Sequence, residues 1–370
     1  MESERIVTLA VHTYEKAQML KSFLEVEGIE CFLENMNLIQ GAVSSGVQVM
    51  IKESDVEKAL QLVDVLRESE FRAHLHKHGG AAKILVPVDF APHSYQALDV
   101  AIDWAYKLNA EITILHTYFL PILSSIPFGD NFSFDINAEE MVVDLKEKAE
   151  EELKKIVLYA EERTSSKPLK KVAIKSHLTS GIAEEEIVKY SNTYRPTLIV
   201  MGTRSKDKKS NDLIGSVTAE VLDIASFPVL AIPEVFKYTQ VDDFKNVLFV
   251  TNFEENDLMA LEKLDEIIKP IDVNIHCVHI GNHKDGKWDD VKMKGLHEHL
   301  TRKHKESKIT CSLVDTTDYW KGIEDYILEH KIDLVTSTTH RRGFLSRIMN
   351  PNLSKKMLFH TDLPLLVFHD

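Results

Sequence analysis

The sequence predicts an α/β fold with two doubly wound, mostly parallel five-stranded sheets that carry helices on both faces, preceded by a small α+β domain. Short apolar runs typical of buried strands alternate with amphipathic helical segments from about residue 81 onward. The same order of segments recurs in the last third of the chain, which indicates an internal repeat of a whole domain. The first 70 residues follow a different order and form a separate domain.

The N-terminal domain is expected at residues 1–70. Three strand patterns, RIVTLAVHT, IECFLENM and GVQVMIKES, are interleaved with the helical patterns YEKAQMLKSFLEVEG and DVEKALQLVDVLRES. Asp55 stands near the N-cap of the second helix. The order βαββα predicts one sheet with two helices. FRAHLHKHGG, residues 71–80, is expected to be a linker.

The second domain is expected at residues 81–236. Its five predicted strands are KILVPVDF, AEITILHTY, VAIKSHLT, PTLIVMGT and FPVLAIP. Predicted helices lie between them: SYQALDVAIDWAYKLN, a charged helix from about Ala138 to Arg163, GIAEEEIVKYSNTY and SVTAEVLDIAS. Strands that alternate with helices predict right-handed crossovers and a parallel sheet.

The third domain, residues 243–370, repeats this order. KNVLFVTNF corresponds to KILVPVDF, and VNIHCVHIG to ITILHTY, so that His279 aligns with His116. KGIEDYILEHKIDLVTSTTH and FHTDLPLLVFH match the later segments, and most of the long 119–137 insertion is missing. The fifth strands of both copies are short apolar edges that need a partner, so we expect them to pair with each other as an intrachain pseudo-dimer. Whether two chains form a homodimer stays open.

Composition argues against several classes of partner. The formal net charge of -14 argues against nucleic acid and against anionic membranes as partners. No apolar run approaches the roughly 18 residues that span a bilayer, and the N-terminus has no signal-peptide layout. The three cysteines are scattered and show no CxxC. Each is expected to be a small buried hydrophobe in a cytoplasmic protein.

Three predicted strand ends converge on one candidate site. Asp89 follows the first strand of the second domain, Thr117 the second, and Gly202 the fourth. In a parallel sheet, ligands bind at the carboxyl ends of the strands, near the point where strand order reverses. The helix that begins near Ser216 offers free N–H groups to an anion, and Gly215 lets a phosphate approach the backbone.

These motifs resemble a known family. Residues 83–233 resemble the universal stress proteins through ILVPVDF, ILHTY, LIVMGT, IGSVTAEVL and FPVLAIP, and residues 245–370 resemble a second, diverged copy. Through AVHTYEKAQMLKSFLEVEGIECFLEN and VMIKESDVEKALQLV, the N-terminal domain resembles a family of prokaryotic signal-transducing proteins. The resemblance implies a doubly wound fold and the binding of ATP or another adenine nucleotide, with Mg²⁺ held mostly by the phosphates.

The resemblance also implies a role for each residue of the site. Many members follow the pattern Gly-x-x-Gly, nine residues, Gly-Ser/Thr. That spacing recurs here, and the implied nucleotide-binding residues are Pro87, Val88, Asp89, Thr117, Gly202, Arg204, Ser205, Gly215, Ser216, Val217 and Thr218. Asp89 is expected to meet the nucleoside, Pro87 and Val88 to line the base, and Thr117 to offer backbone groups to adenine.

Ser205 departs from the pattern, which has glycine at that position. If the backbone there needs a positive φ, serine costs roughly 1–2 kcal/mol, about one order of magnitude in affinity. Arg204 and the lysines that follow it add positive charge that would offset this loss. In the second copy the site residues change, with Asn252 in place of Asp89 and Ser337 in place of Gly202, so a structural role is expected there.

No catalytic or metal-binding residue is predicted. GxSxG and HExxH motifs are absent, and Asp89 has no second carboxylate near it in sequence. The expected function is nucleotide-dependent signalling in the stress response, with no enzymatic turnover. Two alternatives stay open: an interaction scaffold that binds no nucleotide, and a weak ATPase.

Overall fold

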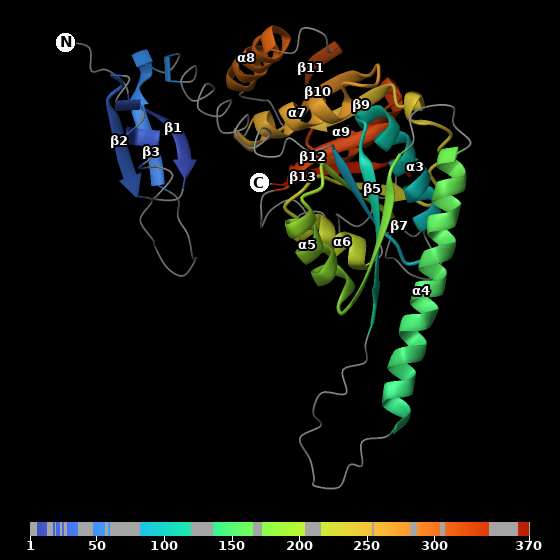
Figure 1. Ribbon diagram of the computed structural model, residues 1–370. Coiled ribbons are helices and arrows are strands. Elements are labelled where there is room, and N and C mark those ends of the chain that lie inside the picture. Colours follow the sequence, from blue (N-terminus) through green and yellow to red (C-terminus); the bar gives the residue numbers. More distant parts are fainter. Residues whose placement is uncertain are drawn as a thin grey trace, which may run out of the picture. The chain divides into compact units, whose positions relative to one another are not determined.

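The chain divides into two compact units, Met1–Gly80 and Ala81–Asp370, so both α/β repeats fall within the second unit. The computed structural model (Figure 1) describes residues 6–12, 18, 20–22, 24–25, 28–35, 47–55, 58–59, 82–119, 136–165, 172–203, 216–253, 255–281, 287–303, 308–339 and 362–369.

The N-terminal unit contains an antiparallel sheet with strand order β1-β3-β2. Its elements are β1 (Ile6–His12), β2 (Cys31–Asn35), β3 (Val47–Lys52) and the short 3-10 turn η1 (Glu53–Asp55). The three strands lie where the sequence pattern predicts them. Leu24, Ile29 and Ile51 are fully buried and form the centre of a small core. The two predicted helices fall largely outside the described residues.

The first half of the larger unit follows the predicted order of strands and helices. Its elements are β4 (Lys83–Pro87), α3 (Pro92–Leu108), β5 (Glu111–Tyr118), α4 (Ile136–Ser165), β6 (Ile174–Ser180), α5 (Ala183–Tyr194), β7 (Leu198–Thr203), α6 (Ser216–Ile224) and β8 (Val229–Pro233). The helix pattern began at Ser94, whereas α3 starts two residues earlier because Pro92 suits the first turn of a helix.

The second half repeats this succession after the 3-10 turn η2 (Val241–Asp243). Its elements are β9 (Asn246–Val250), α7 (Glu255–Ile268), β10 (Asn274–Gly281), α8 (Lys287–Lys303), β11 (Lys308–Asp315), α9 (Tyr319–His330), β12 (Leu334–Thr339) and β13 (Leu365–His369). The sequence pattern did not single out β11. It is an outer strand with only partly buried side chains, so its apolar signal is weak.

The two five-stranded sheets predicted from the sequence are halves of one ten-stranded sheet, in the order β11-β10-β9-β12-β13-β8-β7-β4-β5-β6. All neighbouring strands run parallel except β8 and β13 at the centre, which pair antiparallel through Leu366 opposite Leu230 and its neighbours. The fifth strands therefore complete each other's edges. His369 adds a contact, because its Nε2 lies 2.9 Å from the carbonyl oxygen of Leu222 in α6.

Alternate residues of the strands feed two hydrophobic cores, one on each face of the sheet. Ile84 and Val86 of β4 belong to a core shared with α3, α4, α7 and α8. Leu85 of the same strand belongs to the opposite core, which α5, α6 and α9 cover. Each core runs through both halves, so the halves fold as one unit.

The segment between the halves packs against α3. Phe244 stacks on Phe236 with ring centroids 5.9 Å apart and lies 6.4 Å from the ring of Trp104. The Tyr238 hydroxyl donates to a carboxylate oxygen of the buried Asp103 at 2.7 Å. The segment between β8 and β9 is therefore held against α3, the helix that also borders the candidate site.

Gly202, the penultimate residue of β7, allows α3 to approach the sheet closely. A Cβ at this position would overlap the backbone carbonyl of His93 in the first turn of α3. The overlap involves backbone on both sides, so no side chain can move to relieve it. Glycine is therefore needed at this position for packing, whatever ligand binds nearby.

We expect Gly202→Ala to lower the free energy of unfolding of the larger unit by about 1–3 kcal/mol, because the new methyl group overpacks the contact with α3. Urea denaturation followed by circular dichroism measures this change. Gly295→Ala is the matched control, since Gly295 lies in α8 with nothing within 4 Å of a Cβ. It should raise stability by up to about 1 kcal/mol. Equal effects of the two substitutions would contradict the packing argument.

Candidate functional site

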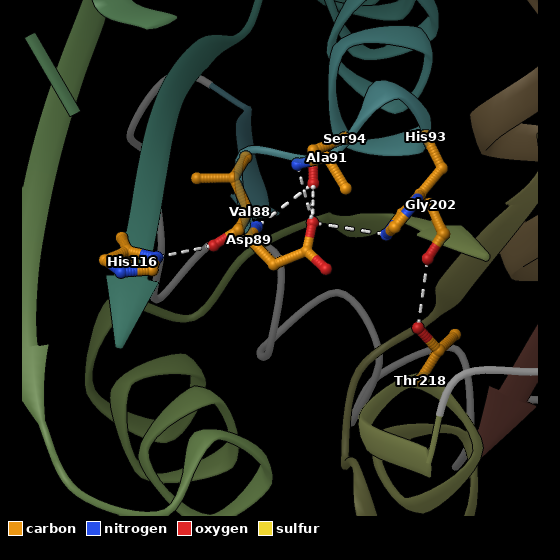
Figure 2. Close-up of polar contacts among 8 residues, drawn as sticks. All are labelled: Val88, Asp89, Ala91, His93, Ser94, His116, Gly202 and Thr218. Carbon is orange, nitrogen blue, oxygen red and sulfur yellow. Dashed lines mark hydrogen bonds and ion pairs between the residues drawn. The ribbon is translucent and has the colours of Figure 1, made fainter. Parts of the chain in front are cut away.

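Three neighbouring strands of the first half end at the same edge of the sheet. β4 lies between β5 and β7, and the chain first moves from β4 to β5 on one side and later returns through β7 on the other. Strand order reverses at β4, the place where parallel sheets bind ligands. The structure brings the predicted residues Asp89 and Gly202 together at this point, and Figure 2 shows them beside the first turn of α3.

Asp89 stands at the centre of a hydrogen-bond cluster between β4 and α3 (Figure 2). Its Oδ1 accepts hydrogen bonds from the Ala91 backbone N–H at 3.1 Å and from the Ser94 hydroxyl at 2.8 Å. The Nε2 of His93 lies 3.2 Å from the same oxygen. Ser94 Oγ accepts in turn from the Asp89 backbone N–H at 3.1 Å. The carboxylate is thus held in one orientation, although 46% of the side-chain surface is exposed.

His93 and Ser94 were not predicted as site residues. His93 is only 8% exposed as a side chain, and both residues turn back toward the strand end from the first turn of α3. The sequence did carry a signal, because His93 stands four residues after Asp89 at the start of a helix. Whether such a histidine faces the strand end depends on the entry angle of the helix, which Gly202 sets here by its close approach.

The environment keeps Asp89 ionised. Partial burial acts to raise its pKa, but hydrogen bonds involving His93, Ser94 and the Ala91 backbone outweigh burial and hold the pKa of Asp89 well below its usual range. An ionised carboxylate only accepts hydrogen bonds. Asp89 is therefore suited to hydroxyl or amine donors, and its low pKa makes it a poor general base.

Val88 and His116 lie next to Asp89 at the ends of β4 and β5. Val88 is 7% exposed, and its N–H donates to the Leu115 carbonyl at 2.9 Å. His116 Nδ1 lies 2.8 Å from the Val88 carbonyl, which can only accept, so Nδ1 carries the proton. Burial lowers the pKa of His116, so the ring is neutral at neutral pH. Because its N–H and C=O are both engaged, Val88 can offer a ligand only apolar contact, and Pro87 beside it is buried.

Phe90 covers the other side of His116, with ring centroids 4.1 Å apart. Its backbone has a φ of 64°, a left-handed conformation that phenylalanine rarely adopts. This turn directs the chain from the end of β4 into α3 and leaves Asp89 at the corner. The strained residue therefore positions the carboxylate through the backbone.

Thr117 lies on β5 beyond the last residue that pairs with β4. The carbonyl of Leu115 accepts a hydrogen bond from Val88, so the backbone groups of Leu115 point toward β4. Backbone groups two residues apart on a strand point in the same direction. The N–H and C=O of Thr117 therefore also point to this side, but past the end of β4. Its side-chain Oγ1 is buried and has no hydrogen-bond partner among the described residues. Thr117 thus offers a donor and an acceptor next to Val88 and Asp89.

α6 is tied to the end of β7. The Thr218 hydroxyl donates to the Gly202 carbonyl at 3.1 Å (Figure 2). Val217 is partly buried and packs against the core under α5 and α6. Two of the predicted nucleotide-binding residues therefore have structural contacts that fix the start of α6, which begins at Ser216. Arg204, Ser205 and Gly215, and the side chain of Ser216, lie outside the described part of the chain.

The second half preserves the scaffold of this site. His279 Nδ1 lies 2.7 Å from the Thr251 carbonyl, as His116 does from Val88. Phe253 has a φ of 61° and covers His279 at 4.4 Å, as Phe90 covers His116. The alignment of the two histidines predicted from the sequence is confirmed, and both serve the fold at the strand end.

The polar centre of the second half is different. Asn252 replaces Asp89, and Asp257 stands where the first half has Ser94. Asp257 is 3% exposed and accepts hydrogen bonds from the Thr251 hydroxyl at 2.8 Å, the Asn252 N–H at 2.8 Å and the Thr338 hydroxyl at 2.6 Å. A carboxylate of the protein itself therefore fills this corner. Residues 340–361, which follow β12, lie outside the described part of the chain.

No group of three or more His, Cys, Asp or Glu side chains in the described part of the chain is arranged to hold a metal ion. None of the described helices is both long enough and apolar enough to span a bilayer.

Comparison with known proteins places two families on the chain. The profile of the universal stress protein family matches residues 81–233, and a family described as "Putative prokaryotic signal transducing protein" matches residues 14–67. Universal stress protein MJ0531 of Methanocaldococcus jannaschii is 31% identical over 150 residues, which are 40% of this chain and 81% of that protein. Universal stress protein YxiE of Bacillus subtilis is 26% identical over 150 residues, 40% of this chain and 97% of that protein.

A solved structure extends the likeness in fold. The crystal structure of a universal stress protein from Archaeoglobus fulgidus covers 78% of this chain and 96% of its own, with 21% identity and a TM-score of 0.59. The matched profile includes the strand ends that carry Asp89, Thr117 and Gly202. On these similarities, the chain belongs to the universal stress protein family.

Proposed function

We propose that the first half of the larger unit binds an adenine nucleotide, ATP or a relative of it, and that the protein signals its occupancy in a stress response. The observation that carries the proposal is Asp89, a half-exposed carboxylate fixed at the point where strand order reverses. A carboxylate that stays ionised and oriented is a strong acceptor for the hydroxyl groups of a ribose.

The neighbouring groups fit the remaining parts of a nucleotide. Adenine carries a hydrogen-bond donor and acceptors on its edges, and Thr117 directs a backbone acceptor and donor past the end of β4. Val88 offers an apolar floor for the base. The phosphates would lie toward the start of α6 at Ser216, where free N–H groups favour anions. Mg²⁺ would be held mostly by the phosphates.

The second half would act as the structural partner of the first, in an arrangement equivalent to a dimer within one chain. Asp257, at the corner that corresponds to Asp89 and Ser94, is buried and already accepts hydrogen bonds from the protein's own donors, so it would not meet a ribose hydroxyl as Asp89 does. One nucleotide per chain is therefore proposed. The N-terminal unit would carry the signal to a protein partner, in keeping with its match to a signal-transducing family.

Turnover is not part of this proposal, because the low pKa of Asp89 makes it a weak base for activating water. The alternative is an interaction scaffold that binds no nucleotide. It is favoured by the second half, whose own side chains already fill the corresponding corner. Calorimetric titration with ATP, AMP and cyclic AMP separates the two proposals.

We expect Asp89→Asn to weaken nucleotide binding by about tenfold or more, because it removes the charge from the acceptor that meets the ribose. The amide oxygen can still accept from Ser94 and Ala91, so the fold should persist. Isothermal titration calorimetry measures the change in Kd. Asn252→Ala is the matched control at the corresponding corner of the second half and should leave Kd unchanged.

Three other outcomes would count against parts of this scheme. Absence of heat and of any thermal shift with all three nucleotides would favour the scaffold. Two molecules bound per chain would contradict the assignment of a structural role to the second half. Hydrolysis of ATP that Asp89→Asn abolishes would show that the carboxylate takes part in turnover.

The low pKa of Asp89 also predicts how binding depends on pH. The unfolded-state pKa is about 4, and the folded value is lower. The contacts of the ionised carboxylate therefore stabilise the fold fully above the unfolded value and are lost only as pH falls through the folded value. For cyclic AMP, whose phosphate does not titrate in this range, the ratio of Kd between Asp89→Asn and the unchanged protein should stay constant from about pH 8 to about pH 5. A ratio that approaches one near the acid end would contradict the low pKa.

A further inference from the structure

Cys277 and Cys311 lie directly opposite each other on neighbouring parallel strands. Cys277 is on β10 and Cys311 on β11, and the pairing register places them side by side. Neighbouring strands are about 4.7–4.9 Å apart, within the Cα separation of roughly 4.4–6.8 Å that disulfides span. Residues opposite each other in register point to the same face of the sheet, and both cysteines belong to the core under α7 and α8. A covalent bond between them therefore needs little movement of the backbone.

The two thiols differ in access to solvent. Cys277 is 0% exposed, whereas Cys311 is only partly buried on the outermost strand of this half. α8, which carries the exposed His297, packs across β11 (Figure 1). Part of Cys311 is open to solvent, and Cys277 lies beside it on the neighbouring inner strand.

Electrostatics reinforce this difference. Its interaction with the Cys277 thiol, and next the influence of the His297 ring, lower the pKa of Cys311 although partial burial acts to raise it. The pKa of Cys277 is raised, through its bond with Cys311 and through burial. Burial likewise raises the pKa of Cys31, in the N-terminal unit, to about 11. The thiolate is the more nucleophilic form of a cysteine, and Cys311 is also the least buried of the three, so Cys311 is the one that reacts first.

We propose that Cys311 and Cys277 form a hydroperoxide-sensitive thiol pair, in which Cys311 is oxidised first and Cys277 then closes an intrachain disulfide. The thiolate sulfur of Cys311 attacks one oxygen of hydrogen peroxide, the O–O bond breaks, and the departing hydroxide takes up a proton to become water. The Cys277 sulfur then attacks the sulfenic acid of Cys311. The S–S bond forms, the S–O bond breaks, and the thiol proton leaves with the oxygen as a second water.

The disulfide would have a structural consequence for this half of the sheet. β10 and β11 are joined by α8, so the bond would close a loop that contains the whole helix and its His297. The disulfide would hold β11 covalently to β10. β11 and α8 could then no longer detach together from the rest of the sheet. Oxidation would thus stabilise the end of the sheet farthest from the proposed nucleotide site.

The test treats the full chain with hydrogen peroxide, blocks free thiols with N-ethylmaleimide and maps peptides without reduction. We expect a crosslinked peptide that joins Cys277 to Cys311, while Cys31 is recovered alkylated and reacts at least about tenfold more slowly. Cys277→Ser should leave a sulfenic acid on Cys311 that dimedone traps. Cys311→Ser should abolish both the crosslink and the trapping, and Cys31→Ser is the matched control that should change neither.

His297→Gln tests the contribution of the helix and should slow the formation of the crosslink several-fold, because less of Cys311 is thiolate. Circular dichroism confirms that each variant is folded, and the peptide map of the unchanged protein decides the matter if one is not. The proposal is overturned if peroxide gives only crosslinks between chains. Direct conversion of Cys311 to sulfinic acid without the Cys277 crosslink, or modification of Cys31 at the same rate, would also overturn it.

Discussion

The antiparallel pairing of β8 with β13 is the contact on which the rest of the larger unit depends. Both strands are apolar and fully or largely buried, and each would otherwise be the edge of a five-stranded sheet with unpaired backbone groups. Their pairing produces a single sheet of ten strands and lets one hydrophobic core run along each face through both halves. The aromatic segment that joins the two halves packs against α3. The central strand pair is therefore linked by direct contacts to the helix that carries His93 and Ser94.

A comparison of the two halves distinguishes residues that maintain the fold from residues that could bind a ligand. Both keep a histidine whose Nδ1 bonds a carbonyl at the strand end, and both keep a phenylalanine in a left-handed conformation over that histidine. These features persist in the second half although Asp89 is replaced by Asn252, so they belong to the strand-to-helix turn itself. What differs is the acceptor: the first half exposes the carboxylate of Asp89, and the second buries that of Asp257.

Most of the scaffold could be predicted because buried strands leave continuous apolar runs such as KILVP and VLAIP, and helices leave a periodic pattern. β11 could not, since an outer strand buries its side chains only in part. His93 and Ser94 escaped prediction because their direction depends on the approach of α3 to Gly202, a contact between segments distant in sequence. The sequence predicted each cysteine to be a small buried hydrophobe. Their proximity follows from the register of β10 and β11, which a sequence with one unrecognised strand cannot supply.

Three contacts converge on Oδ1 of Asp89, and they have a consequence for any molecule that this carboxylate meets. A surface aspartate normally samples several rotamers and loses that freedom when it binds, which weakens the association. Here folding has already restricted the rotation, so a ligand hydroxyl would find the acceptor in place. Such a site would gain affinity from a slow dissociation of correctly oriented ligands, and it would discriminate by the direction of a hydroxyl group as much as by its presence.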